Sequence, residues 1–227
     1  MSVPRWKAFD FEAKREFYEM LSKELTPHKK ALFEEKVRHR TRHFTLGLEN
    51  MMKTQNASAL MRTADAFGVQ RVDVYDKEER WSVSSGISKG VEKWLDVSFF
   101  NTYDEGDALT WATRLKEKGH KLYVTALDAK ARPVNSLDPK VPATICFGNE
   151  KEGASATLLE AADETVYIPM QGFVESFNVS VSCGIVMHHM TLGMERAGIA
   201  RGLEPEDELD TLIQWALRTV PQPQRFA

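Results

Sequence analysis

Three short segments of the sequence place amide, carboxylate and hydroxyl side chains where helices are expected to begin. The first, "NASALMRTADAFG", starts at Asn56 and carries Arg62 six residues later. The second, "FGNEKEGAS", sets Glu150 between two glycines, and the third, "ESFNVSVSCG", crowds Ser176 and Asn178 before a helix. Backbone N–H groups at a helix N-terminus are unpaired, so polar side chains there can help to build a ligand site. The three segments are therefore candidate parts of a polar active site.

Each segment also has an ordinary structural interpretation. Asn56 could cap a helix whose arginine lies on the surface. Glu150 could be an exposed residue in the turn between Gly148 and Gly153, and the third segment could be a helix cap with more polar side chains than it needs. The second segment matches neither the P-loop nor the GxGxxG fingerprint, because both spacings are wrong. Taken singly, none of the segments assigns a function.

Asn56 and Asn178 each begin an Asn-x-Ser triplet, which is the acceptor for N-glycosylation in secreted proteins. The N-terminus, "MSVPRWKAFDFEAKREFYEM", lacks the apolar stretch of a signal peptide, and no run approaches the roughly 18 apolar residues of a membrane span. Cys146 and Cys183 lie in apolar surroundings without metal-binding spacing, so we expect buried, reduced thiols. We therefore expect a cytoplasmic protein without membrane contact, in which the two asparagines serve other chemistry.

The charge is unevenly distributed along the chain. The 227 residues carry a net charge of −3, which does not suggest a polyanionic partner. However, the stretch "HKKALFEEKVRHRTRH" holds six basic residues against Glu34 and Glu35. Three interpretations remain open: a solvated helix face, pairing with the acidic segment 204–210, or an RNA-docking surface. The six candidate RNA-binding residues are Lys29, Lys30, Lys36, Arg38, Arg40 and Arg42.

The hydrophobic pattern predicts alternating strands and helices. A domain of this kind is an α/β domain with a mainly parallel sheet that is covered by helices on both faces. In the helix expected over 105–120, Leu109, Ala112 and Leu115 form the apolar face. Loops after parallel strands carry the ligand sites of such domains. We expect strands at 44–49, 69–76, 96–100, 121–127 and 143–148 and a short one ending at 167–170, with helices at 10–43, 56–68, 105–120, 178–198 and from the acidic tail to about 220.

Taken together, in order and spacing, the motifs resemble those of the SPOUT-class RNA 2′-O-ribose methyltransferases. More specifically, they are similar to the TrmH-like group of tRNA (guanosine-18-2′-O)-methyltransferases, whose third motif looks like "IPMQGFVESFNVSVS". The resemblance covers roughly residues 44–198. This chain departs from the group in having "MKTQN" where a proline usually precedes the asparagine. It also has Phe177 where leucine is usual, which would reshape the adenine side of the pocket.

The resemblance implies a fold, a cofactor and an organisation of the chain. The C-terminal part of the core would form a deep trefoil knot and bind S-adenosylmethionine without a metal, and the enzyme would act on tRNA as a homodimer. The core at 44–198 would follow a basic helical extension at 1–43 that docks RNA and precede a helical extension at 199–227. The same resemblance assigns catalysis to Asn56, Arg62, Glu150, Ser176 and Asn178. It assigns cofactor binding to Thr125, Ala126, Leu127, Gly148, Ile168, Met170, Ser176 and Phe177.

In this reaction a ribose 2′-oxygen attacks a sulfonium methyl group. Because arginine stays protonated up to about pH 12, Arg62 suits the binding of phosphate and developing oxyanion charge better than the role of a base. Phosphate-assisted deprotonation through Arg62 remains an alternative. Two other functions also stay open: methylation of ribosomal RNA by the same fold, and RNA binding without catalysis. An unrelated nucleotide-binding α/β enzyme is disfavoured, because the GxGxxG and P-loop motifs are missing.

Overall fold

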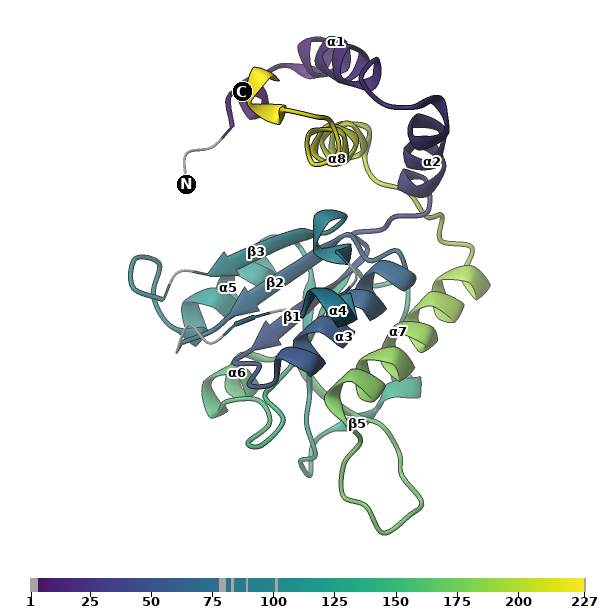
Figure 1. Ribbon diagram of the computed structural model, residues 1–227. Coiled ribbons are helices and arrows are strands. Elements are labelled where there is room, and N and C mark those ends of the chain that lie inside the picture. The colour runs from purple at the N-terminus through teal and green to yellow at the C-terminus, as the bar shows by residue number, and fades with distance from the viewer. Residues whose placement is uncertain (1–3, 78–80, 83, 89, 101, 227) are drawn as a thin grey trace. The chain divides into compact units, whose positions relative to one another are not determined.

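The computed structural model describes residues 4–77, 81–82, 84–88, 90–100 and 102–226 (Figure 1). The chain divides into two units. The core domain is Arg42–Ala200, and the helical unit combines Met1–Thr41 with Arg201–Ala227. The expected catalytic and cofactor-binding residues all lie in the core domain.

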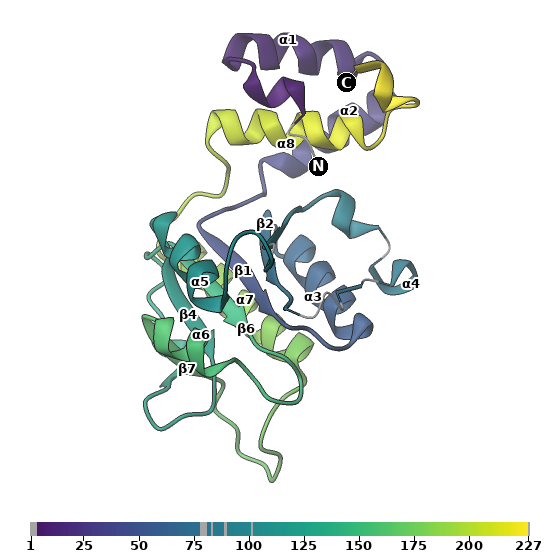
Figure 2. The ribbon, with the colours of Figure 1, turned by 90° about the vertical axis from the view of Figure 1, so that its left-hand side faces the viewer.

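The described residues of the core domain form a sheet of seven parallel strands in the order β3-β2-β1-β6-β4-β7-β5 (Figures 1 and 2). The β2 and β3 strands follow β1 on one side, and the later strands lie on the other side. The strand order therefore reverses beside β1, which is where ligands bind in open α/β sheets. The strands are β1 (Phe44–Glu49), β2 (Arg71–Tyr75), β3 (Asp96–Phe100), β4 (Lys121–Thr125), β5 (Arg132–Pro133), β6 (Ala143–Phe147) and β7 (Glu164–Tyr167).

Side chains that alternate along the central strands enter two hydrophobic cores. Leu46, Leu48 and Ile145 pack in the core that contains α3 and α7, whereas Cys146 and Leu122 pack in the core that contains α5 and α6. Strands buried on both faces are mostly apolar along their whole length, which explains the composition of "FTLGLE" and "ATICF". The prediction of a parallel sheet covered on both faces is confirmed. The four covering helices are α3 (Thr54–Ala66), α5 (Ala108–Glu117), α6 (Ala156–Ala161) and α7 (Val179–Arg196).

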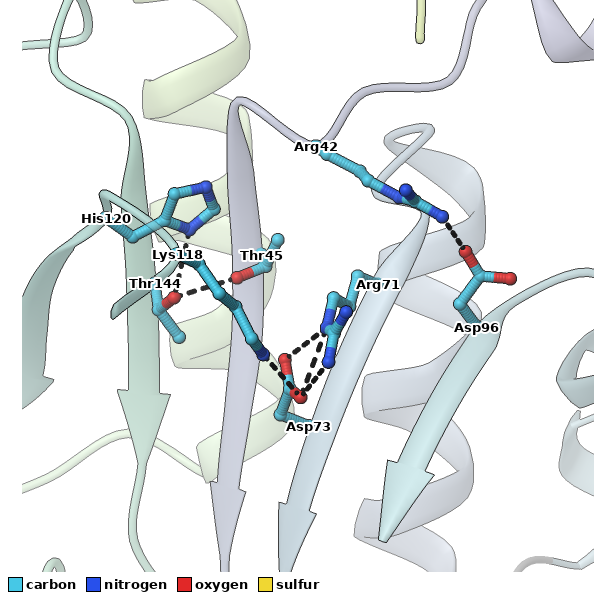
Figure 3. A network of polar contacts seen from close by, with 8 residues as sticks. All are labelled: Arg42, Thr45, Arg71, Asp73, Asp96, Lys118, His120 and Thr144. Atoms are coloured by element: carbon cyan, nitrogen blue, oxygen red, sulfur yellow. Dashed lines mark hydrogen bonds and ion pairs between the residues drawn. The ribbon is translucent and has the colours of Figure 1, made fainter. Parts of the chain in front are cut away.

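A network of charged side chains links the amino ends of the strands (Figure 3). Asp73 is buried, and it accepts hydrogen bonds from the Arg71 guanidinium and, at 2.9 Å, from the Lys118 ammonium. Arg42 precedes β1, and it pairs at 2.6 Å with Asp96 of β3, the strand next to β2. A buried carboxylate is tolerated only when it is paired in this way. The network also contains Thr45, Thr144 and His120.

The N-terminal and C-terminal extensions pack together as the helical unit. Within it, α1 and α2 both contact α8. Lys14 is buried, and its ammonium pairs with Glu206 at 2.7 Å and with Asp210 at 2.9 Å. The acidic tail therefore pairs with Lys14 of α1. The elements of the unit are the 3₁₀-helices η1 (Arg5–Ala8) and η4 (Pro223–Phe226) and the helices α1 (Phe11–Ser22), α2 (Pro27–Val37) and α8 (Pro205–Leu217).

Three boundaries or faces differ from the sequence predictions. The helix expected over 10–43 is two helices, because Thr26 caps α2 and Pro27 occupies its first position. The α3 helix begins at Thr54, so Asn56 lies inside its first turn and is not the N-cap. Leu109 is 52% exposed, whereas Ala112 and Leu115 are buried as predicted.

Short helical turns α4 (Ser85–Ser88), η2 (Val91–Lys93) and η3 (Val134–Ser136) complete the described elements. Within these residues, no helix has both the length and the apolar character of a membrane span.

Candidate active site

A cavity of about 600 Å³ opens at the carboxyl edge of the sheet, where β4, β6 and β7 end. Asn56, Glu150 and Asn178 line it, one from each of the three sequence motifs. Loops after neighbouring parallel strands meet at this edge, which explains how distant segments come together. The residues expected to bind the cofactor also line the cavity: Thr125, Ala126, Leu127, Gly148, Ile168, Met170, Ser176 and Phe177.

Glu150 joins the second motif to the first. Its Oε1 atom accepts hydrogen bonds from the Asn56 amide at 2.7 Å and the Lys53 backbone N–H at 3.1 Å. Its Oε2 atom accepts one from the Met52 backbone N–H at 3.1 Å. Partial burial raises the pKa of Glu150, but the hydrogen bonds outweigh this effect, so the pKa lies below its ordinary value. Glu150 is therefore an ionised acceptor at neutral pH that caps the N-terminus of α3 and orients Asn56.

Asn56 and Asn178 are in direct contact. The Asn178 amide nitrogen donates to the Asn56 amide oxygen at 3.1 Å. The Asn178 amide oxygen accepts from the backbone N–H of Ser180 at 2.8 Å and from its hydroxyl at 2.5 Å, which makes Asn178 the N-cap of α7. Glu150 therefore fixes the orientation of the Asn56 amide, and Ser180 and Asn56 together fix that of Asn178. Each amide keeps a second N–H group that no described residue accepts, and such donors suit a hydroxyl oxygen.

Gly148 directly follows β6 and begins a tight loop. Asn149 and Gly153 exchange backbone hydrogen bonds at 3.1 Å across this loop. A Cβ atom at position 148 would lie 2.1 Å from the backbone nitrogen of Ala154, so only glycine fits there. Gly153 has a φ of 75°, a conformation that glycine adopts without strain. Glycine at position 148 is therefore required by the loop itself, whose backbone makes the close approach.

Arg62 is not among the described residues that line the cavity. It lies on an exposed part of α3, and its Nη1 atom donates to the backbone oxygen of Ile87 at 2.9 Å. Six residues along an α-helix correspond to a rotation of roughly 240°, so Asn56 and Arg62 leave α3 in different directions. Arg62 therefore does not join Asn56 at the wall of this cavity.

Four of the six basic residues expected to contact RNA lie on or next to α2. Lys30 and Lys36 pair with the two glutamates of the helix, at 3.9 and 2.8 Å. Lys29 lies over an aromatic ring of the same helix at 5.5 Å, and Arg38 is exposed after its end. Exposed pairs of this kind are weak, typically about 0–1 kcal/mol, so an incoming phosphate can displace them.

Arg40 and Arg42 have different surroundings. Arg40 is only 7% exposed, and its guanidinium lies 5.0 Å from the ring centroid of Trp215. The assignment of Arg40 to RNA contact is therefore corrected, because this cation packs against an aromatic ring inside the helical unit. Arg42 belongs to the core domain, where it pairs with Asp96 at 2.6 Å.

Comparison with known proteins gives the site its context. The sequence matches the model of the SpoU rRNA Methylase family over residues 43–188, which is more than half of the chain. The chain belongs to this family. It is 33% identical over 180 residues to the tRNA (guanosine(18)-2'-O)-methyltransferase of Borreliella burgdorferi, an alignment that covers 79% of this chain and 80% of the relative.

A second SpoU relative and a solved structure extend the similarity beyond the core. The tRNA (guanosine(18)-2'-O)-methyltransferase of Thermus thermophilus is 32% identical over 195 residues, covering 85% of this chain and 98% of the relative. The crystal structure of the Aquifex aeolicus TrmH/SpoU tRNA modifying enzyme matches with a TM-score of 0.77 at 26% identity, covering 89% of this chain and all of that one. The core domain has 159 residues, so both alignments continue into the helical unit.

Some residues in or next to this cavity carried little signal in the sequence. Glu49 is 1% exposed, and its carboxylate accepts from the backbone N–H of Ser155 at 2.8 Å and from its hydroxyl at 2.6 Å. This contact ties the end of β1 to the start of α6, and its only sequence signal is an acidic residue that closes an apolar strand. Lys53 and Asp128 line the cavity as well, but neither carried a signal of its own.

The two cysteines of the chain both lie inside the core domain. Cys146 and Cys183 are free and buried, as predicted, and burial raises the pKa of both thiols. Such thiols are poor nucleophiles and poor metal ligands. The described part of the chain contains no cluster of three or more His, Cys, Asp or Glu residues that could hold a metal ion.

Proposed function

We propose that this chain is an S-adenosylmethionine-dependent RNA 2′-O-ribose methyltransferase that acts on guanosine 18 of tRNA. The observation that carries the proposal is the hydrogen-bonded chain from Glu150 through Asn56 to Asn178 at the wall of the cavity. It unites the three motifs that resemble those of the TrmH-like enzymes. The tRNA enzymes named above align with this chain over 79% and 85% of its length, which supports the same substrate.

The cavity fits the proposed cofactor in size and chemistry. Its volume of about 600 Å³ lies within the range of pockets that enclose a molecule of this size. Leu127, Ile168, Met170 and Phe177 supply apolar contacts, and the loops after β4, β6 and β7 supply backbone groups. We propose that the last of these loops belongs to the trefoil knot of the SPOUT class. When bound, S-adenosylmethionine would supply a sulfonium methyl group, an electrophile that requires no metal.

The residues of the chain have the task of placing and activating the ribose. Asn56 and Asn178 each offer a spare amide N–H to the ribose hydroxyls and can so fix the 2′-oxygen. Glu150 holds the Asn56 amide in its orientation and does not exchange protons. Transfer of the methyl group from sulfur to the 2′-oxygen would require the 2′-hydroxyl proton to leave to solvent or to a phosphate oxygen. Positioning is the main catalytic contribution, because the electrophile is already activated.

We assign Arg62 to the charge that develops on the 2′-oxygen. Its guanidinium donates a hydrogen bond to the Ile87 carbonyl. A bond of this kind contributes roughly 0.5–1.5 kcal/mol net, so a bound RNA that reaches this exposed side of α3 can replace it. The guanidinium stays charged at neutral pH and therefore acts as an electrostatic stabiliser.

We also propose that the enzyme is a cytoplasmic homodimer that docks tRNA through its helical unit. Phe173, Val174 and Val181 are exposed apolar residues around the third motif, and a second copy of the chain would cover them. Lys29, Lys30, Lys36 and Arg38 stand on or next to α2 as the proposed contacts to phosphate. The alternative substrate, ribosomal RNA, is suggested by the name of the family.

Two experiments test the proposed function. Calorimetry with S-adenosylmethionine in the presence of a chelator should show binding; a requirement for a divalent ion, or no binding at all, would contradict the proposal. Methyl transfer to a tRNA transcript should occur at guanosine 18, and a matched transcript with 2′-deoxyguanosine at that position should accept nothing. Methylation of ribosomal RNA but not of tRNA would favour the alternative substrate, and cofactor binding without transfer would favour a non-catalytic relative.

A further inference from the structure

Lys53 lines the cavity, and no contact within the described fold accounts for its positive charge. It is exposed, it directly precedes α3, and it lines the cavity within three residues of Asn56. Its ammonium group has neither an ion-pair partner nor a hydrogen-bond partner among the described residues. The other lysine of the cavity wall, Lys151, lies 4.0 Å from the carboxylate of Glu152. Lys53 is therefore the cavity cation that is left for a ligand.

The backbone beside Lys53 cannot take over this task. The N–H groups of Met52 and Lys53 already donate to Glu150, each at 3.1 Å. An anion that approaches the first turn of α3 also meets the negative charge of that carboxylate. Binding of an anion at this place therefore depends on the Lys53 ammonium, which is long and flexible enough to reach past Glu150.

The reaction involves two anionic groups, and the position of Lys53 distinguishes between them. One is the carboxylate of the cofactor, whose proposed contacts lie on the loops after β4, β6 and β7. The other is the phosphate next to the target ribose, and the ribose must lie against the amides of Asn56 and Asn178. Lys53 belongs to the loop before α3, on the side of Asn56, and not to the cofactor loops. Its position favours the RNA phosphate.

We propose that Lys53 binds the phosphate group adjacent to the ribose that is methylated. The inference rests on the proposed function and adds a residue to it. Lys53 takes the phosphate role that the sequence suggested for Arg62, which leaves Arg62 to stabilise the developing oxyanion. A point charge on a flexible stem is sufficient for this contact, so arginine can replace lysine here.

The first test measures tRNA affinity as a function of salt for Lys53→Ala, Lys53→Arg and the matched control Lys151→Ala. Lys53→Ala should weaken tRNA binding roughly fivefold to tenfold at low salt and reduce the slope of log affinity against log salt by roughly 0.7–0.9. Lys53→Arg should keep the slope. Lys151→Ala should change little, because that ammonium already has a carboxylate neighbour. An equal loss in Lys151→Ala would show a general field effect and overturn the assignment.

The second test removes the charge of the RNA phosphate instead of the lysine side chain. A tRNA that carries a neutral methylphosphonate next to guanosine 18 should lose affinity for the wild type but not for Lys53→Ala, because the same contact cannot be lost twice. Losses that add would overturn the proposal. Calorimetry should give the same S-adenosylmethionine affinity for Lys53→Ala as for the wild type, and a weakened cofactor affinity would assign Lys53 to the cofactor carboxylate. Failure of the proposed function is distinct, because the wild type would then bind no cofactor and methylate no tRNA.

Discussion

Replacement of Glu150 by glutamine keeps the shape of the side chain but removes its charge and one acceptor oxygen. The carboxylate accepts from the backbone N–H groups of Met52 and Lys53 and from the Asn56 amide. The glutamine amide would present its own N–H groups to at least one of these donors. The orientation of Asn56 would then no longer be fixed, and the Asn178 amide would lose its defined acceptor on Asn56.

The size of the effect follows from the number and exposure of these bonds. The two backbone bonds are exposed, and the bond to Asn56 is partly buried. Loss of a helix cap typically costs about 0.5–2 kcal/mol, and a partly buried charge-assisted bond adds to that value. We expect Glu150→Gln to lower the free energy of unfolding by about 1–2 kcal/mol. For a chain of this length that corresponds to a fall in Tm of roughly 2–8 °C.

The pH dependence supplies the sharper test. The pKa of Glu150 is lowered in the folded state, so its contribution is present above the unfolded pKa of about 4.3 and is lost as the pH falls through the folded value. The difference in unfolding free energy between wild type and Glu150→Gln should therefore be constant above about pH 5 and shrink at lower pH. Denaturant unfolding at a series of pH values measures this difference in unfolding free energy.

Glu152→Gln is the matched control, because that side chain is on the same loop and 74% exposed. It should leave both stability and methyl transfer near the wild-type values. Glu150→Gln should in addition slow methyl transfer more than it weakens cofactor binding, because the amides that hold the ribose lose their orientation. A Glu150→Gln variant as stable and as active as Glu152→Gln would refute the reasoning.

Three further predictions concern other residues. Arg62→Ala should reduce methyl transfer roughly 100-fold or more while S-adenosylmethionine affinity in calorimetry stays within about twofold; near wild-type turnover would contradict its role. Gly148→Ala should destabilise the protein by about 1–3 kcal/mol and weaken cofactor binding, because its Cβ would meet the backbone of Ala154, whereas Gly172→Ala has open space and should do neither. Arg38→Ala should flatten the salt dependence of tRNA binding by roughly 0.7–0.9, whereas Arg40→Ala should lower Tm through lost packing on Trp215; the opposite pattern would reverse the two assignments.

The local pattern of the sequence was enough to predict the architecture, whereas the resemblance of the motifs named many of the residues that line the cavity. The strands "FTLGLE" and "ATICF" are mostly apolar because both faces of a parallel sheet are covered, and this property is visible without coordinates. The residues expected to bind the cofactor were named from the resemblance of the motifs, and they line one cavity because loops after neighbouring parallel strands share one edge of the sheet. The third segment could be interpreted as a helix cap from the sequence, and Asn178 is that cap, since capping is a local interaction.

Contacts between distant segments required the tertiary structure. Nothing in the sequence shows that Glu150 caps α3, because the acceptor and the helix are separated by about a hundred residues. The same applies to the burial of Arg40 against Trp215 and to the pairing of Lys14 with Glu206, each of which joins opposite ends of the chain. The sequence by itself determined which groups can do the chemistry, because residue type and local spacing are written there. Only the tertiary structure decided which of them meet, because those contacts depend on how the strands are ordered in the sheet and on how the chain ends pack.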